Sequence, residues 1–354
     1  MRRKTRIDGW LCVGLAFAAA TANAQSTPHP ALLALSKQDH TLAIVDPRDM
    51  HVVARVPVGD DPHEVVASAD GKTAYVSNYG FGSLHTLAVI DLVAQKPLPS
   101  VDLGALKGPH GLVFEGGKVW FTAEAAKAIG RYDPVSAKID WVMGTGQDRT
   151  HMLWVSRDLK RIATTNVSAA TVTVMDETEP QPRGGPPPGL GPGGPPGPPP
   201  LPRGPDWLLT VLPVGRGAEG FDVSPDGKEA WVANAGDGTV TVIDLAAKRV
   251  VATLEANVRG ANRLEFTPDG RRVLISAGVL VVIDAKARQV VKRIETVHAT
   301  GGIQLQPDGA RAYAACGRDG YVAAVDLTTL EMVGKVDVPG PDGLAWADQV
   351  GLKP

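Results

Sequence analysis

The stretch that decides the fold is Ser224-Pro-Asp226-Gly227-Lys-Glu-Ala-Trp231-Val-Ala-Asn234. Its Pro-Asp-Gly core favours a tight turn, because proline fixes φ, aspartate bonds back to the backbone and glycine accepts positive φ. The small, apolar and aromatic residues that follow are typical of a β-strand. The stretch therefore predicts a turn that leads from one strand into the next.

The same turn-and-strand pattern recurs along the chain. It begins again at Ser68, Thr267 and Gln306, more loosely at Ser156, and with Gly-Gly in the turn at Phe114. Seven short apolar stretches also end on aspartate, which can hydrogen-bond to the turn after it: Asp46, Asp91, Asp133, Asp176, Asp244, Asp284 and Asp326. Seven such strands predict seven repeated units.

The spacing of the units identifies the architecture. We take one reference position just before each predicted inner strand: His63, His110, His151, Glu219, Asn262, Gly301 and Asp342. The intervals between them are 39 to 47 residues, apart from one of 68. Four strands in a period near forty are typical of a propeller blade. The sequence predicts an all-β chain that forms a seven-bladed β-propeller with four-stranded antiparallel blades.

The two ends of the repeat predict how the ring closes. The N-terminal part supplies three strands, over residues 31–35, 41–46 and 52–56, whereas the C-terminal part supplies one inner strand, over residues 343–346. We expect the ring to be closed by this C-terminal inner strand joining the N-terminal blade.

Residues 1–24 have the pattern of a cleavable signal peptide. A basic start precedes an apolar stretch, and Ala22-Asn23-Ala24 offers a cleavage site. The apolar stretch is too short for a membrane span, so we expect no transmembrane anchor and a periplasmic or secreted protein. Removal of the peptide would leave Cys316 as the single cysteine, which excludes an intramolecular disulfide.

We expect residues 25–354 to form a single β-propeller domain. The long interval contains a Pro/Gly-rich segment, residues 177–205, which has too few apolar residues to build a core. It is predicted to be a disordered insertion in blade four. The whole chain has 36 Lys and Arg against 38 Asp and Glu, with no basic cluster, so nothing indicates a nucleic-acid partner.

Tyr75-Val-Ser-Asn78 and Trp231-Val-Ala-Asn234 resemble the hallmark of the YVTN-repeat (YncE-like) propeller family. The resemblance extends from about Leu32 to Trp346. It implies the propeller fold and relatives that include non-enzymatic exported proteins. More distant propellers include lactonases and the haem d1 domain of nitrite reductase, so the fold leaves the chemistry open.

The reference positions are also the candidate site. They are expected in the loops that enter the inner strands, at the mouth of the central channel. The ligand-binding candidates are His63, His110, His151, Glu219, Asn262 and Asp342, with Arg149 and Arg263 beside them to hold an anionic group. Residues at the ends of the second strands, among them Tyr79 and Glu124, should open on the same face.

This chemistry leaves several functions open. The first is an exported binding or interaction protein that uses the channel mouth to hold a protein or a small polar or anionic ligand in the envelope. A second is a lactonase-like hydrolase or lyase with a ring histidine as base. A third is a metal-binding or redox accessory protein, with a transition metal at His63, His110 and His151. A water-filled channel without a ligand is the fourth.

No nucleophile elbow, phosphate loop or zinc-protease helix occurs in the sequence, so it favours a protein that is not an enzyme. We also expect a monomer. A transition metal at the histidine ring is the one cofactor that the sequence suggests.

Overall fold

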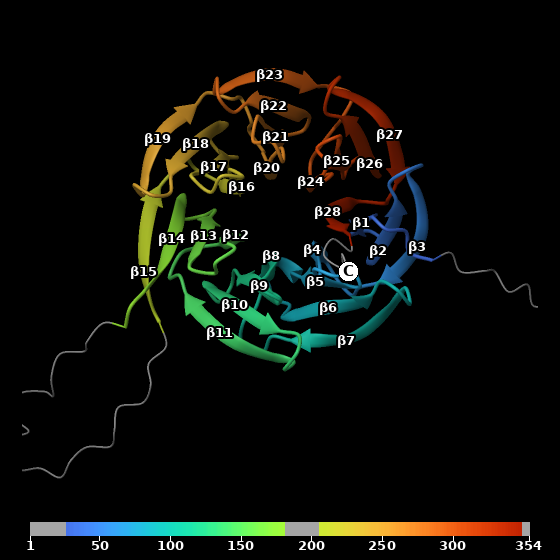
Figure 1. Ribbon diagram of the computed structural model, residues 1–354, viewed down its shortest axis with the longest axis horizontal. Coiled ribbons are helices and arrows are strands. Elements are labelled where there is room, and N and C mark those ends of the chain that lie inside the picture. The colour runs from blue at the N-terminus through green and yellow to red at the C-terminus, as the bar shows by residue number, and fades with distance from the viewer. Residues whose placement is uncertain (1–25, 181–204, 349–354) are drawn as a thin grey trace, which may run out of the picture.

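The computed structural model describes residues 26–180 and 205–348, which form a seven-bladed β-propeller around a central channel (Figure 1). Each blade is a four-stranded antiparallel sheet, as predicted. Among the described residues, the one helical element is a short 3-10 turn, Gly80–Gly82. None of the described helices is long and apolar enough to cross a membrane.

The strands of the first four blades follow the chain from the inner to the outer strand. Blade one contains β28 (Pro341–Ala347), β1 (Ala31–Ser36), β2 (Thr41–Asp46) and β3 (His51–Pro57). Blade two contains β4 (Pro62–Ala67), β5 (Thr73–Asn78), β6 (Thr86–Asp91) and β7 (Lys96–Asp102). Blade three contains β8 (Pro109–Glu115), β9 (Lys118–Ala123), β10 (Ala128–Asp133) and β11 (Lys138–Gly144). Blade four contains β12 (Thr150–Val155), β13 (Arg161–Asn166), β14 (Thr171–Thr178) and β15 (Asp206–Pro213).

The last three blades repeat this order. Blade five contains β16 (Ala218–Val223), β17 (Glu229–Asn234), β18 (Thr239–Asp244) and β19 (Arg249–Leu254). Blade six contains β20 (Arg263–Phe266), β21 (Arg272–Ser276), β22 (Leu280–Asp284) and β23 (Gln289–Ile294). Blade seven contains β24 (Ile303–Leu305), β25 (Arg311–Cys316), β26 (Tyr321–Asp326) and β27 (Glu331–Asp337).

The same turn geometry recurs from blade to blade and explains why these residues form hairpins. Asp226 accepts hydrogen bonds from the Ser224 hydroxyl at 2.7 Å and the Lys228 amide at 3.1 Å, and Gly227 takes a φ of 71°. At the end of the third strand, Asp244 accepts hydrogen bonds from the backbone amides of Ala246 and Ala247, at 2.9 and 2.8 Å. Both turn types behave as the sequence predicts.

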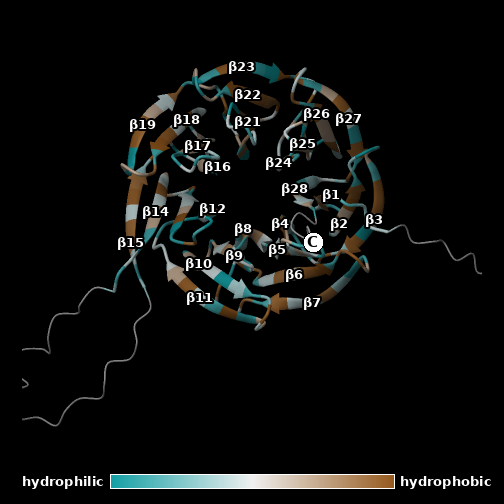
Figure 2. Cartoon of the chain, in the orientation of Figure 1, coloured by the Kyte–Doolittle hydropathy of each residue, from teal (hydrophilic) through white to brown (hydrophobic). Residues whose placement is uncertain are grey.

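The strand order gives the propeller two different faces. Every inner strand starts on one face, here called the ring face, and ends on the opposite face, here called the turn face, where all but β28 lead into a hairpin turn. The second and third strands supply the core, where Trp120, Trp231 and Tyr313 are fully buried. Outer strands alternate hydrophilic and hydrophobic residues, as Figure 2 shows for β11 and β15.

The insertion in blade four starts later than the sequence suggested. Strand β14 continues to Thr178, and Glu177 and Thr178 pair with Trp207 and Asp206 of β15. Assigning Glu177 and Thr178 to a disordered segment was therefore wrong, because the hairpin extends through both residues. Residues 181–204 and the predicted signal peptide, residues 1–24, lie outside the described residues.

The ring closes as predicted. Strand β28 pairs antiparallel with β1, placing Leu32 opposite Trp346 and Ala34 opposite Leu344. Leu344 and Leu32 are buried in one cluster that extends into blade seven. The two ends of the described chain therefore share one sheet.

Deletion of residues 343–354 should lower the melting temperature by about 10 °C or more. The deletion removes most of an inner strand and its buried side chains, and loss of one buried leucine side chain alone costs about 2–5 kcal/mol. Thermal unfolding followed by circular dichroism measures this. Deletion of residues 349–354 alone is the matched control, and equal melting temperatures for the two truncated chains would contradict the closure.

Candidate functional site

A recurrent β-bulge positions the candidate site. In blade two, Pro62 pairs with Asn78 but Val65 pairs with Val76, so two residues, His63 and Glu64, face one residue of β5. The same shift occurs in β8, β12, β16 and β28. A bulge bends its strand and redirects a side chain. The bulged positions are His63, His110, His151, Glu219 and Asp342.

This geometry corrects one detail of the sequence analysis. These five residues were expected in the loops that lead to the inner strands, but each is the second residue of its strand. The strands begin earlier because the bulge lets the chain pair once before the candidate residue and again after it.

Side-chain hydroxyls hold the bulges in place and link neighbouring blades. The Thr122 hydroxyl accepts a hydrogen bond from the Gly111 amide at 2.9 Å and donates one to the carbonyl of His151, in the next blade, at 2.6 Å. Ser77 and Thr165 make the same two kinds of contact in blades two and four. The backbone that carries His110, His151 and Glu219 is thus fixed in each case by the blade before it.

His110 lies at the centre of a row of three imidazoles. Its ring centroid is 3.8 Å from that of His151 and 4.2 Å from that of His63. The His110 side chain is completely buried, and neither of its ring nitrogens has a hydrogen-bond partner. Burial and the neighbouring His151 and His63 hold the pKa of His110 well below its usual value, so the ring is neutral near pH 7.

His151 has the opposite electrostatic environment. Its Nδ1 lies 2.5 Å from Glu124 Oε1, and its Nε2 lies 3.0 Å from Glu219 Oε1. Burial acts to lower the pKa of His151, but the two carboxylates outweigh it and raise the pKa to about 9. The other oxygen of Glu124 accepts a hydrogen bond from the Tyr79 hydroxyl. His110 and His151 therefore differ in charge although their rings are in contact.

The third histidine joins this row to the closing strand. His63 Nδ1 lies 2.5 Å from Lys37 Nζ and 3.0 Å from Asp342 Oδ2. Lys37 also pairs with Asp61 at 2.8 Å. Burial opposes ionisation of Asp342, but His63, Lys37 and Arg263 outweigh it and lower the pKa of Asp342 to about 2. The predicted candidates His63 and Asp342 therefore meet across the seam of the ring.

Two predicted candidates do not join this group. Arg263 is buried, contacts Glu64, and donates to both the carbonyl and side-chain oxygens of Asn262. It lines a channel cavity of about 290 Å³ together with Glu64, Glu265 and Gln304. Arg263, the first residue of β20, lies beside the ring residue Asn262 and also lines the channel cavity.

Sequence reasoning missed Lys37 and gave Glu124 and Tyr79 no specific role. All three residues directly follow the second strand of their blades, and each contacts a histidine or its partner. Aligning the residue that directly follows the second strand of each blade could have identified Lys37. The contacts themselves depend on how the blades pack.

Two groups of the described residues bring three ligand atoms close enough for a metal ion. In the first, which consists of His110, Glu124 and His151, these atoms lie within 4.8 Å of one another and all three residues are buried. The second consists of Asp46, Asp49 and His51 on the turn face. Asp46 is already paired with Arg48 and Asp49 is exposed, which makes the first group the stronger candidate.

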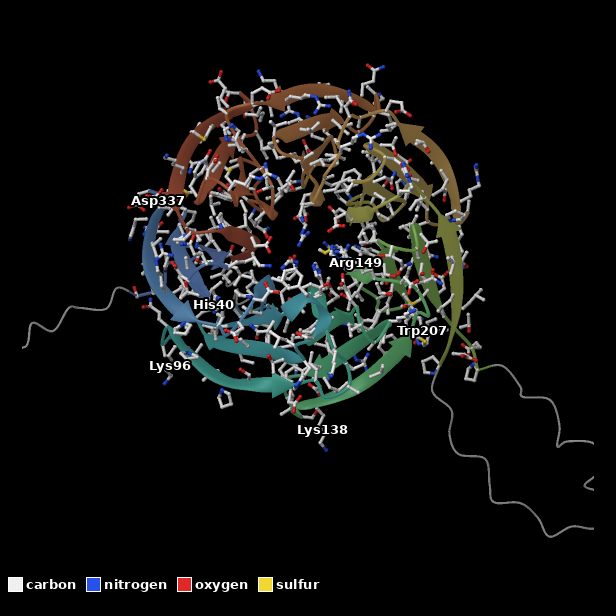
Figure 3. All side chains as sticks on the ribbon, turned by 180° about the vertical axis from the view of Figure 1, so that it is seen from behind. His40, Lys96, Lys138, Arg149, Trp207 and Asp337 are labelled. Atoms are coloured by element: carbon white, nitrogen blue, oxygen red, sulfur yellow. The ribbon has the colours of Figure 1, made fainter. Side chains whose placement is uncertain are left out.

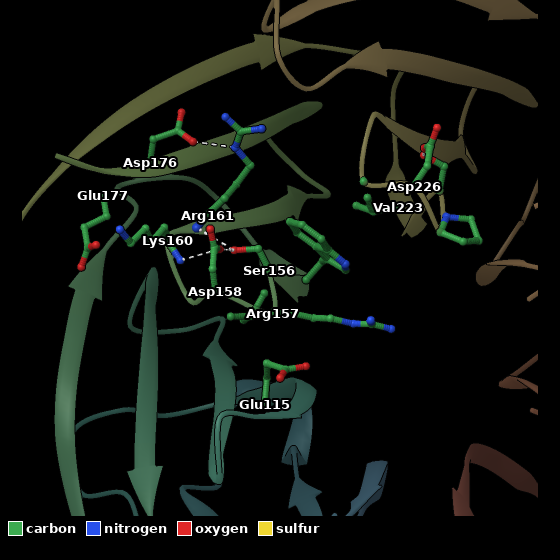
Figure 4. Close-up of a pocket in the computed structure, with 15 residues that line it drawn as sticks. Glu115, Ser156, Arg157, Asp158, Lys160, Arg161, Asp176, Glu177, Val223 and Asp226 are labelled. Carbon is green, nitrogen blue, oxygen red and sulfur yellow. Dashed lines mark hydrogen bonds and ion pairs between the residues drawn. The ribbon is translucent and has the colours of Figure 1, made fainter.

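A larger cavity lies elsewhere. It has a volume of about 900 Å³ and lies on the turn face between blades four and five (Figure 4). Among its charged groups, Arg161 is paired with Asp176 at 2.5 Å. None of the predicted candidate residues lines it.

Comparison with known proteins supports the fold and gives limited information on function. Residues 215–307 match the family model of the cytochrome D1 heme domain. This segment includes Glu219 but none of the three clustered histidines. No curated protein sequence matches the chain.

Several solved structures share the architecture. A functionally unknown protein from Desulfotomaculum acetoxidans is 12% identical, with a TM-score of 0.69 over 90% of this chain and 99% of that chain. A protein assigned as a 6-phosphogluconolactonase from Bacteroides uniformis is 16% identical, with a TM-score of 0.68 and the same coverages, 90% and 99%. The dihydro-heme d1 dehydrogenase NirN is 14% identical, with a TM-score of 0.60 over 90% of this chain and 75% of that chain. At these identities, the likeness shows the propeller fold alone.

The histidine row does not fit a haem iron. An axial ligand must present a ring nitrogen to a broad planar macrocycle. His110 and His151 are 0% and 1% exposed, and each imidazole is covered by another. His63 packs against both His110 and Tyr79, with ring centroids 4.2 and 5.1 Å away. The residues present suit a bare ion better than a haem.

Replacement of Thr122 by valine should lower the free energy of unfolding by about 1–3 kcal/mol, because a buried amide and a buried carbonyl each lose a hydrogen bond. Urea unfolding measures the change. Thr122→Ser keeps the hydroxyl and should lose less stability. If valine and serine were equally destabilising, the hydroxyl bridge would not be what holds the bulge.

A carboxyl in the channel predicts a pH dependence of stability. Burial and the nearby Asp222 carboxyl raise the pKa of Glu265 well above its ordinary 4.5. The folded state therefore binds more protons than the unfolded state above that value, and stability should fall as pH rises. Glu265→Gln should reduce the loss of stability between about pH 5 and pH 8.

Chemical unfolding at a series of pH values tests this prediction. Glu331→Gln, on the outer strand β27, is the control for removal of a carboxylate far from the channel. A wild-type pH profile retained in Glu265→Gln would show that Glu265 does not hold the proton.

Proposed function

We propose that this chain is an exported, monomeric binding propeller of the YVTN-repeat type, whose ring face holds a divalent transition-metal ion. His110, His151 and Glu124 are the proposed ligands. The observation that carries the proposal is the buried His110, whose two ring nitrogens lack partners. Buried polar groups without partners are costly and uncommon, and a bound ion would satisfy one of these nitrogens.

The chemistry of the ligand set supports this assignment. Two imidazoles and a carboxylate suit Zn²⁺ and non-haem Fe²⁺, and imidazole also suits Cu²⁺ and Ni²⁺. His63, with its edge towards His110, is placed to provide a further imidazole. The set is compact, since the ligand atoms of His110, Glu124 and His151 already lie within 4.8 Å of one another.

The residues around the ligands support it as well. Glu219 lies 3.0 Å from Nε2 of His151, which leaves Nδ1 as the ligand atom on the Glu124 side. Tyr79 donates to the second oxygen of Glu124. Metal-binding histidines commonly have a carboxylate on the distal nitrogen, and ligating carboxylates are themselves hydrogen-bonded.

The hydrolase alternative receives less support from this geometry. A general base must be unprotonated and must reach the proton that it removes. His110 and His151 are both fully buried, so neither imidazole reaches a substrate proton in the channel. The fold that this chain shares with a protein assigned as a lactonase adds no catalytic residue to the argument.

Metal analysis of the purified protein tests the proposal. Protein incubated separately with Zn²⁺, Co²⁺, Ni²⁺ and Cu²⁺, then desalted, should retain about one ion per chain of at least one metal. His110→Ala and Glu124→Gln should lower its affinity at least about a hundredfold, since each removes or weakens a direct ligand.

The matched control is His298→Ala. His298 is exposed, pairs with Asp319 at 2.6 Å, and precedes the inner strand of blade seven on the ring face. Its loss should leave metal content unchanged. Metal-free wild-type protein under every condition, or equal metal content in all variants, would refute the proposal.

A further inference from the structure

In six of the seven blades, the backbone two residues before the bulged or equivalent position adopts a left-handed conformation. In four blades glycine occupies this slot: Gly108, Gly217, Gly260 and Gly340, with φ between 55° and 71°. Glycine adopts such values without steric cost, whereas other residues pay about 1–2 kcal/mol. Asp61, with a φ of 43°, and Arg149, with a φ of 57°, are the two non-glycine residues in this slot that take positive φ.

Asp61 has a local reason to be there. Its carboxylate accepts a hydrogen bond from the Gly80 amide at 2.9 Å and pairs with Lys37 at 2.8 Å. Aspartate also tolerates the left-handed region better than most residues. Neither reason applies to arginine.

Arg149 is held only loosely by its neighbours. Its guanidinium lies 3.6 Å from Glu124 and 3.8 Å from Glu219, whereas charge-assisted hydrogen bonds are about 2.7–2.9 Å long. Its side chain is 43% exposed and lies beside the channel opening (Figure 3). A left-handed arginine in a slot that glycine fills in four other blades, with an exposed and loosely paired side chain, points to a use for that side chain.

Other cations on this side of the ring face are already closely paired. Lys127 lies 2.5 Å from Asp148, and Arg216 lies 2.7 Å from Asp237. Of Lys127, Arg149 and Arg216, Arg149 therefore has the longest ion-pair distances, and it lies beside the proposed metal ligands.

The charges indicate which ligand Arg149 would meet. Glu124, Glu219, Arg149 and protonated His151 sum to zero charge, and a divalent ion that displaces the His151 proton would change that sum to one positive charge. An exposed guanidinium next to such an ion favours an anion with two oxygens, since its fork can bind both at once.

We propose that Arg149 binds the anionic group of a small ligand, a carboxylate or an oxoanion, that approaches the metal ion from the ring face. This inference rests on the metal site proposed above. It assigns Arg149 the role of the residue that selects for negative charge, and it makes anion binding dependent on the ion.

Anion titrations of the Co²⁺-loaded protein test the proposal. Acetate, oxalate and phosphate are the probes, followed by the visible Co²⁺ spectrum and by calorimetry. At least one probe should bind, and Arg149→Gly should weaken it at least about tenfold. Tighter binding of oxalate would indicate an organic acid as the ligand, and tighter binding of phosphate a phosphate group.

Arg149→Gly separates this role from a structural one. It restores the residue found in four other blades and relieves the positive φ, so its melting temperature should equal or exceed that of the wild type. Arg149→Lys keeps the charge but loses the fork, and should bind the anion with intermediate affinity. Arg216→Ala is the control and should bind like the wild type.

The outcomes distinguish the two proposals. Equal anion affinity in wild type and Arg149→Gly at full Co²⁺ content would overturn the role of Arg149 and leave the metal site intact. Failure of every metal to bind would overturn both proposals.

Discussion

The pairing of β28 with β1 is the constraint on which the rest of the structure depends. This pair completes the seventh four-stranded sheet from the two ends of the described chain, and it fixes the circumference of the ring. The same pair brings Asp342 of the last strand against His63 of blade two. Ring closure therefore also completes the candidate site, because an open ring would leave His63 and Lys37 without their partner Asp342 from the C-terminal strand.

Repetition makes the backbone of each blade nearly the same, and the site arises where the side chains differ. The bulge presents one residue from each of five blades, and the hydroxyls of Ser77, Thr122 and Thr165 fix its backbone without regard to what that residue is. Imidazoles could therefore replace other side chains in this slot without disturbing the blade. Physically, this is how a scaffold of equivalent positions can hold three adjacent histidines.

The fold could be predicted because each of its rules is local. The turn at Asp226, the capping by Asp244 and the three-plus-one arrangement of strands each follow from a few consecutive residues. The candidate site could be predicted in part, since the repeat alignment identified His63, His110 and His151. The bulge, the partnership of Glu124 with His151 and the inward turn of Arg263 depend on packing between blades, which no local pattern reports.

Three unfavourable features occur together on the ring face. His110 has unpartnered ring nitrogens in a buried position, His151 is held as a buried cation against a neutral imidazole, and Arg149 has a left-handed backbone. The unpartnered nitrogens and the left-handed arginine each cost free energy, and burial of the His151 cation is offset by Glu124 and Glu219. A sequence that is consistent at most positions tends to break the rules where function requires it. Because the three features concern neighbouring groups, one ligand with a positive charge that also attracts an anion would account for all of them.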